Sequence, residues 1–534
     1  MNARNVRWFL VLGVMAAFAC GKAPAQAPTL PTETPQGPSS LPGSNTSAFG
    51  NVPGAGGTSF AAPAVGGGQI LGGRPGAATP RVPTSVSTPG AGGNQAPSAS
   101  VTAIPAAAPL TEVPLFGTLD LPAAADEGPP DGLTFDQALD LLIRQNLDLR
   151  SRQYEIPLAQ ADILTAGLRA NPIFYADSQL IPYGAYSQKR QGGPLQYDVN
   201  ISHPIDYSRK RLARLAVASQ TKKAVELQYQ DAVRVQIGNL AGAYVGALAA
   251  RETLRYAEAG LKGLDRILAA TERLQKFGNR TSADVLLIEA QKGAAEVGVM
   301  DAREGLRKAK LALGGYLNIP PEQAEAIELR ASLRDSEPPA PPINELTQLA
   351  LSCRPDVVGY RVGVDVARAG LRLQYANRYA DAYVLYQPYT FQNLAYLGNH
   401  PGATSWALGV TVPLPLYNRN QGNIERAKLN IEQTKVQLEA VERLVIKEVR
   451  DAEQEYLSTR SYLDRLEQTV IPAAKKAMGD SSRLYEEGET ADVTTFLNVQ
   501  QRYNDLVRLY RDTAVRHRRS MFGLNTAVGA RVLP

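Results

Sequence analysis

The side chains that most often carry catalysis or bind metals are few in this sequence and lie far apart. None of the histidines has the short spacing of a metal site, and the cysteines form no C-x-x-C pair. We also find no G-x-S-x-G, P-loop or dinucleotide-binding pattern in the region predicted to fold. The sequence therefore predicts no catalytic residue, no metal site and no cofactor. The residues in question are His203, His400, His517, Cys20 and Cys353.

Charged residues gather instead at two breaks between predicted helices, at 277–286 and 485–493. Each break joins a glycine that can end a helix to a Ser or Thr that can cap the next helix, with an Asp near the positive helix end. A capped helical hairpin would show this pattern. A second interpretation is that the breaks form a tip that gates a pore or docks a partner. The residues concerned are Gly278, Arg280, Asp284, Gly488, Glu489 and Asp492.

The charge of the chain gives no indication that nucleic acid is a partner. The 534 residues include 56 Lys and Arg and 51 Asp and Glu, for a formal net charge of +5. The basic residues are spread along predicted helices rather than gathered in one patch. With only two cysteines, a disulfide framework is excluded as well.

The first 130 residues contain an export signal and a segment that we do not expect to fold. Residues 1–25 have basic residues, an apolar stretch too short to span a bilayer and then small residues, as a signal peptide does. Cleavage after Ala25 and lipidation of Cys20 both fit this pattern. Residues 26–130 are rich in Pro, Ala, Gly and Ser, and such a composition buries too little apolar surface to offset the entropy of ordering. We therefore predict a disordered tether there.

The rest of the chain contains an internal repeat, with one copy at 131–330 and the other at 343–529. Four positions of the first copy are matched in the second at a nearly constant offset of 208 to 210 residues. Each copy is predicted to contain a helix, two short strands and then long helices separated by a glycine-containing break. The matched pairs are Asp148 and Asp356, Pro204 and Pro413, Gly278 and Gly488, and Gln291 and Gln500.

The absence of proline predicts very long helices in both copies. No proline lies between Pro204 and Pro320 or between Pro415 and Pro472, and an interior proline costs a helix about 3 kcal/mol. Apolar residues in these stretches recur at the spacing of a coiled coil. Residues 208–277 as one helix would be about 105 Å long at 1.5 Å per residue. Such a length suits a rod rather than a compact domain.

Four segments have the length of membrane strands, namely 172–182 and 195–204 in the first copy and 379–391 and 405–415 in the second. In the segment at 195–204 apolar residues alternate with polar ones, which is typical of a strand with one face toward lipid and the other toward a lumen. A soluble hairpin would show the same alternation. Aromatic residues suited to an interfacial girdle are Trp406, Tyr383 and Tyr197.

Any membrane insertion must use these strands, because no apolar run of about 18 residues follows residue 25. Four strands cannot close a barrel, since single-chain barrels begin at about eight. A trimer would supply twelve strands and would bury the apolar faces of the helices around one tube. The predicted fold is therefore mainly α with a small β part. Long antiparallel coiled-coil helices form a periplasmic tunnel, and four strands per protomer join a trimeric 12-stranded transmembrane β-barrel.

Several motifs together resemble the TolC family of outer-membrane efflux proteins, over roughly Gly132 to Gly529. Leu133 to Leu139 opens the first copy with LTFDQAL, and Arg354 to Val357 opens the second with RPDV. Val412 to Gly422, with the sequence VPLPLYNRNQG, follows the last strand. This motif and the Ala-Asn-Pro at 170–172 resemble most the CzcC-like branch, which is associated with heavy-metal efflux.

The resemblance implies a homotrimer in the cell outer membrane, surrounded by outer-membrane lipid, with its helical tunnel in the periplasm. It also implies docking to a periplasmic adaptor (membrane fusion) protein and to an inner-membrane pump of the RND type. The protein would be a passive exit duct for metal cations or drugs and not an enzyme. By resemblance, the two helical breaks become the region of adaptor docking and gating.

Two other classes of protein fit part of the sequence. A periplasmic coiled-coil scaffold would explain the repeat and the heptads, but not paired strands with Trp and Tyr at their ends. A surface or polysaccharide-export protein would explain the export signal and the tether.

Overall fold

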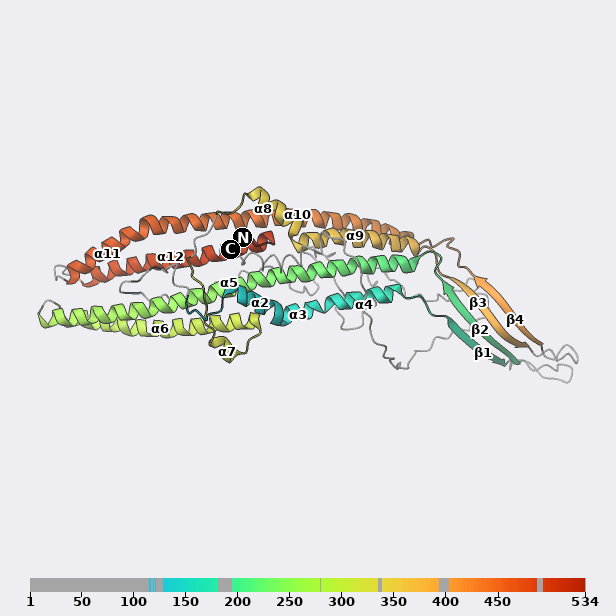
Figure 1. Ribbon diagram of the computed structural model, residues 1–534, viewed down its shortest axis with the longest axis horizontal. Coiled ribbons are helices and arrows are strands. Elements are labelled where there is room, and N and C mark those ends of the chain that lie inside the picture. Colours follow the sequence, from blue (N-terminus) through green and yellow to red (C-terminus); the bar gives the residue numbers. More distant parts are fainter. Residues whose placement is uncertain are drawn as a thin grey trace.

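The structure is a computed structural model, and it describes residues 115, 116, 119, 121, 128–180, 195–278, 280–334, 339–392, 403–486 and 493–533. Long helices lie side by side along one axis, and a small sheet extends from one end of them (Figure 1). The predicted signal peptide and Cys20 lie outside the described residues.

The described part of the first half contains short helices, two strands and two long helices. The short helices are α2 (Phe135–Gln145), α3 (Leu147–Gln153) and α4 (Glu155–Gly167). The strands are β1 (Ile173–Leu180) and β2 (Leu195–Ile205), and α5 (Lys210–Lys276), α6 (Ser282–Leu317) and the short α7 (Pro321–Glu325) follow.

The second half follows a similar order. It begins with α8 (Ile343–Cys353) and α9 (Pro355–Ala376), continues with β3 (Ala382–Gln392) and β4 (Ala403–Thr411), and then enters α10 (Gln421–Arg465). A short π-helix at Leu466–Val470, here called the π-turn, separates α10 from α11 (Ile471–Glu486), and α12 (Val493–Val528) ends the fold.

The prediction of one very long helix in the first half is confirmed. Helix α5 has 67 residues without a break, which at 1.5 Å per residue is about 100 Å. It runs along most of the helical part of the molecule and packs against α6, α9 and α4 (Figure 1). The absence of proline permits this length, and burial of its apolar stripe stabilises it.

The corresponding rod of the second half is interrupted. The π-turn separates α10 from α11, and Pro472 is the second residue of α11. Proline has no N–H to donate to the carbonyl four residues earlier, and a π-turn is one of the few ways in which a helix accommodates this loss. One rod is therefore continuous, whereas the other has a built-in irregularity.

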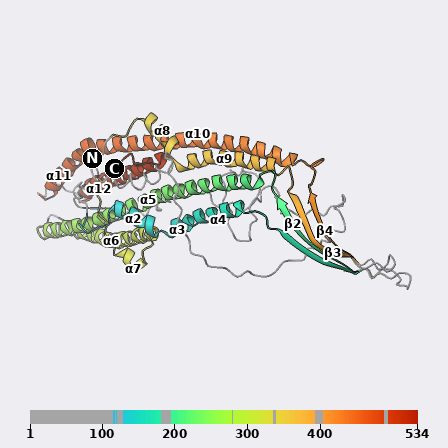
Figure 2. The ribbon, with the colours of Figure 1, turned by 45° about the vertical axis from the view of Figure 1, so that its right-hand side comes forward.

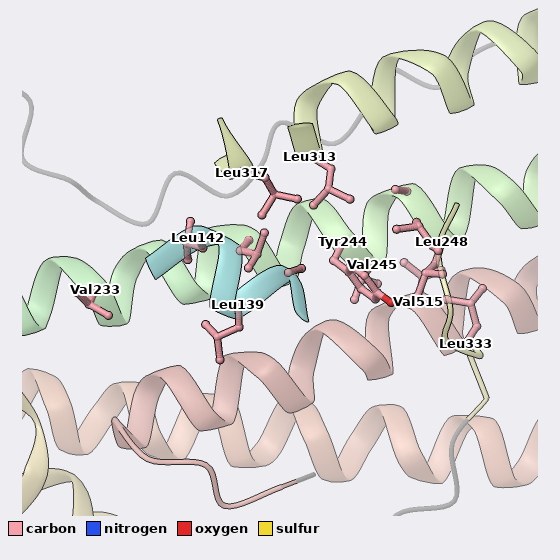
Figure 3. Packing of buried hydrophobic residues seen from close by; sticks show 14 of the residues in the cluster. Leu139, Leu142, Val233, Tyr244, Val245, Leu248, Leu313, Leu317, Leu333 and Val515 are labelled. Carbon is pink, nitrogen blue, oxygen red and sulfur yellow. The ribbon is translucent and has the colours of Figure 1, made fainter. Parts of the chain in front are cut away.

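A buried cluster near the middle of the rods joins the two halves (Figure 3). The phenol of Tyr244 is part of it and donates to the carbonyl oxygen of Leu133 at 2.9 Å. Burying side chains of this size contributes about 1.5–3 kcal/mol each relative to exposure. The cluster includes Leu139 and Leu142 of α2, Tyr244 and Leu248 of α5, Leu313 and Leu317 of α6, and Val515 of α12.

The turn that opens the second half is held by a buried arginine. The guanidinium of Arg354, which is 3% exposed, donates to Asp356 at 2.6 and 3.1 Å, to Glu448 at 2.7 Å and to the carbonyl oxygen of Ala527 at 2.9 Å. Burial raises the pKa of Asp356, but the hydrogen bonds and charge of Arg354 outweigh it and hold this pKa below its usual value. The clamp thus fixes α9 to α10 and to the end of α12.

The first half has a neutral counterpart of this clamp. The Asn146 side chain donates to the carbonyl oxygen of Tyr316 at 2.9 Å, near the end of α6, and accepts from the backbone N–H of Leu149 at 3.0 Å. Asn146 precedes Asp148 as Arg354 precedes Asp356. In both halves, therefore, the residue that precedes a helix donates to a carbonyl at the C-terminal end of a long helix, where the carbonyls lack partners within the helix.

The four strands form one antiparallel sheet in the order β1-β2-β3-β4, so that a strand of each half meets at its centre. The strands extend beyond the ends of the helices (Figure 2). The register of β3 shifts against both neighbours between Tyr386 and Thr390. Pro388 lies at this shift, as expected for a residue that cannot donate to a ladder.

The prediction of a disordered tether is wrong for four residues near its end. Leu115, Phe116 and Leu119 are buried, and Leu121 is partly buried against the same helices. The physical reason is local composition, because these bulky apolar residues interrupt an otherwise Pro-, Ala- and Gly-rich stretch and have enough apolar surface to offset their ordering. We call these four residues the N-terminal strap.

No helix in the described part of the chain is both long enough and apolar enough to cross a membrane.

Candidate membrane belt and helical tip

One face of the sheet exposes large apolar side chains. A row of them crosses all four strands, because Phe174 pairs with Ile201, Ile201 with Tyr386 and Tyr386 with Leu408. Leu408 is 66% exposed and Phe174 is 67% exposed. The exposed set, here called the apolar belt, is Phe174, Tyr197, Ile201, Tyr386, Tyr389, Trp406, Leu408 and Val410.

The opposite face of the sheet is polar and less accessible. Its equivalent row consists of Asp177, Asp198, Thr390 and Ser405. The Asp198 carboxylate is 3% exposed and accepts a hydrogen bond of 3.0 Å from the amide of Gln387. A soluble antiparallel sheet packs its apolar face on a core and shows its polar face to water. Here the arrangement is reversed.

The three predicted girdle residues do not share one face. Tyr197 and Trp406 belong to the apolar belt, and Trp406 is 71% exposed. Tyr383 pairs with Pro204 and Thr411 and is half-buried. Since side chains alternate along a strand, Tyr383 lies on the polar face with Leu385, and Tyr386 takes the outward position.

The turn between α5 and α6 has the geometry that its sequence predicts. Gly278 follows α5 with a φ of +80°, a conformation that favours glycine. A Cβ atom at this position would meet no other atom within 4 Å, so the backbone conformation and not a lack of space favours glycine here. The hydroxyl of Thr281 then accepts from the backbone N–H of Asp284 at 3.3 Å, while the Asp284 carboxylate accepts from the N–H of Thr281 at 3.0 Å. This capping box explains the Thr and Asp structurally.

Of the predicted residues of the other turn, Gly488, Glu489 and Asp492 lie outside the described residues. The helices that border this turn meet the first hairpin through Tyr485, which is 2% exposed. Its ring stacks on Phe496 with the centroids 4.1 Å apart, and the guanidinium of Arg280 lies 5.0 Å from its centroid.

A buried hydrogen bond completes the contact between the two hairpins. The hydroxyls of Thr271 and Tyr485 are 2.7 Å apart. Thr271 donates to the carbonyl oxygen of Ile267 at 2.8 Å, so the phenol is the donor to Thr271. We define the tip cluster as Thr271, Arg280, Tyr485 and Phe496. Sequence reasoning named Arg280 and included Tyr485 only as the first residue of the second break, and it missed Thr271 and Phe496. The signal for Phe496 was an aromatic pair with Tyr485, eleven residues apart on either side of a glycine.

Among the described residues, no group of three or more His, Cys, Asp and Glu side chains is arranged to hold a metal ion.

These features define a class of elongated helical protein with a sheet at one end whose outer face suits a non-polar environment. The chain belongs to the outer membrane efflux protein family, whose model matches residues 138–318 and 346–510. A curated relative is the cobalt-zinc-cadmium resistance protein CzcC of Cupriavidus metallidurans, which is 24% identical over 361 residues, or 67% of this chain and 81% of that protein.

Solved outer-membrane proteins have a similar fold. The outer membrane protein VceC of Vibrio cholerae matches with a TM-score of 0.59 and 18% identity, over 74% of this chain and 96% of that chain. The outer membrane channel CmeC of Campylobacter jejuni matches with a TM-score of 0.60 and 15% identity, over 78% of this chain and 95% of that chain. The resemblance found in the sequence is thus confirmed at the level of family and fold.

Proposed function

We propose that this protein is the outer-membrane channel subunit of a tripartite efflux system and a passive exit duct for solutes. The observation that carries the proposal is the reversed sheet, with its apolar belt outside and Asp198 on the inner face. Lipid favours apolar side chains and offers no hydrogen bonds, whereas a lumen filled with water favours polar ones. Membership of the efflux family agrees with this assignment.

A homotrimer is the assembly that we propose. Strands β1 and β4 are the edges of the sheet, and their open backbone groups need partners inside a membrane. Three copies bring twelve strands, which is enough for a closed barrel. Exposed apolar side chains on α4, at its C-cap and on α10 are available for contacts between copies, among them Leu158, Leu168, Leu429 and Val436, each 63–66% exposed.

We propose metal cations as the exported solutes, with drugs as the second candidate. The relative CzcC is named for resistance to cobalt, zinc and cadmium, and Asp177 and Asp198 add negative charge to the polar face. The protein has no energy source of its own in this proposal. An inner-membrane pump of the RND type and a periplasmic adaptor would deliver the solute.

We further propose that the two hairpin turns form the periplasmic end, where the adaptor docks and the duct is gated. The tip cluster supports this role, because its polar and aromatic contacts join the two hairpins near their turns. The residues 131–330 and 343–529 would be two duplicated units, one hairpin each, which the paired clamps at Asn146 and Arg354 favour.

Two neighbouring residues of β4 give a matched test of the membrane assignment. Leu408 lies on the apolar belt and Ala407 on the polar face. Leu408→Asp should abolish insertion into the outer membrane or trimer formation, since a carboxylate would face lipid. Ala407→Asp should leave both intact. Equal behaviour of the two variants, with soluble protein in each case, would favour the periplasmic scaffold instead.

A further inference from the structure

The N-terminal strap lies where the two hairpins meet. Leu115 and Leu119 are 8% and 0% exposed and belong to a cluster with Tyr256 of α5 and Tyr503 of α12. Phe116, which is 3% exposed, belongs to the next cluster toward the tip, together with Tyr485 and Phe496. The strap therefore contacts the first hairpin and the second hairpin at the same time.

Specific polar contacts hold the strap in addition to apolar packing. The side-chain amide of Asn504, which is fully buried, donates to the carbonyl oxygen of Leu115 at 2.8 Å. The phenol of Tyr503 donates to the carbonyl oxygen of Leu119 at 3.0 Å. Two adjacent residues of α12 thus donate hydrogen bonds to backbone carbonyls of the strap. Leaving the buried Asn504 amide without the Leu115 carbonyl would lower the stability of the fold by about 1–3 kcal/mol.

Helix α5 has a glycine where the strap approaches it closely. A Cβ atom on Gly260 of α5 would come within 3.1 Å of the Leu115 side chain. Glycine inside a helix lowers its stability by about 1 kcal/mol relative to alanine, and here it permits close approach of the strap. Farther along α5, Tyr244 donates to the carbonyl oxygen of Leu133 at 2.9 Å.

The strap also packs against an irregular point of the second rod. Leu466 of the π-turn and Ile471 and Met478 of α11 lie in the same cluster as Leu115 and Leu119. Helix α5 is unbroken, whereas the second rod has the π-turn and Pro472, and irregularities of this kind are where long helices bend. The strap therefore packs at the level where we expect the second hairpin to bend relative to α5.

We propose that the N-terminal strap is a brace that holds the α11–α12 hairpin against α5 at the π-turn, so that the hairpins separate only when the strap is released. The surface of α5 and α12 that contacts the strap is then a binding site for a segment with Leu and Phe side chains, normally filled by the chain itself. The claim that separation of the hairpins opens a duct rests on the proposed function. The binding of the strap to the helices does not.

A pair of leucines gives the test. Leu119 and Leu142 are both fully buried, but only Leu119 belongs to the strap. In the full-length protein, Leu119→Ala should raise amide hydrogen exchange in 471–486 by about tenfold or more, because the segment opens locally once the strap is loosened. Leu142→Ala should leave exchange in 471–486 unchanged while it lowers thermal stability. A synthetic peptide of residues 113–122, added in excess, should restore protection to Leu119→Ala.

Conductance in planar bilayers separates the two proposals. If the strap is a brace on a duct, Leu119→Ala should open about tenfold more often than the unaltered protein, and the peptide should reverse the effect. Unchanged exchange in 471–486, or a peptide without effect on exchange, would overturn the brace. Altered exchange with no channel in any variant would leave the brace standing and remove the proposed function.

Discussion

Replacing Arg354 with methionine should destabilise the protein far more than the same change at Arg361. Both arginines lie at the start of α9 or just before it, and each donates to a glutamate of α10, Arg354 to Glu448 at 2.7 Å and Arg361 to Glu442 at 2.8 Å. Their surroundings differ, since the Arg354 side chain is 4% exposed and the Arg361 side chain 44%.

The magnitudes follow from this difference in burial. Arg354→Met removes both hydrogen bonds that Asp356 accepts from the guanidinium and the one that the carbonyl of Ala527 accepts from it, and breaking a buried pair on one side costs about 3–5 kcal/mol. Arg361→Met breaks an exposed pair and should cost under about 1 kcal/mol. Methionine keeps most of the apolar volume at both sites.

Urea unfolding of the purified protein in detergent, followed by circular dichroism, gives the comparison. Arg354→Met should lower the transition midpoint clearly, and Arg361→Met should leave it nearly unchanged. Equal shifts for the two variants would refute the argument that the buried clamp fixes α9 to α10 and α12.

Two further predictions concern single side chains. Burial, reinforced by the charges of Arg460 and Arg518, lowers the pKa of His517 to about 4, so below pH 6.5 the unfolded chain binds a proton that the folded chain does not. The free energy of unfolding should therefore fall by about 3 kcal/mol between about pH 6.5 and about pH 4, at 1.36 kcal/mol per pH unit. The melting temperature of His517→Phe should depend less on pH in that window than that of the unaltered protein. An identical pH dependence for the two proteins would contradict a neutral buried imidazole. Tyr485→Phe removes only the hydrogen bond to Thr271 and should cost about 1 kcal/mol, whereas Tyr485→Leu also loses the stack on Phe496 and the cation–π contact with Arg280 and should cost more. Melting temperatures that do not fall in this order would show that the tip cluster does not join the hairpins.

The parts of the fold that the sequence predicts depend on local rules. Absence of proline over 208–277 is enough for one long helix, and the observed helix is Lys210–Lys276. The Gly, Thr and Asp of the first break predict its caps, because each acts on the backbone within a few residues. Alternation in 195–204 predicts the two faces of β2, although not which face would be exposed.

The parts that the sequence does not predict depend on contacts between distant segments. The orientation of Tyr383 follows from the pairing of β3 with both neighbours and from the register shift at Pro388. Tyr485 and Thr271 are 214 residues apart, and Asn504 and Leu115 are 389 apart. Composition alone assigned Leu115 to a tether, because the average composition of residues 26–130 does not reveal the few bulky residues that pack on distant helices.

The most direct test of the proposed duct is planar-bilayer conductance of the detergent-extracted protein, with its oligomeric mass measured on the same sample. We predict small, discrete openings that respond to cations, from a particle with three times the mass of the chain. A monomer or dimer without conductance would contradict the account, because the apolar belt would then have to face something other than lipid.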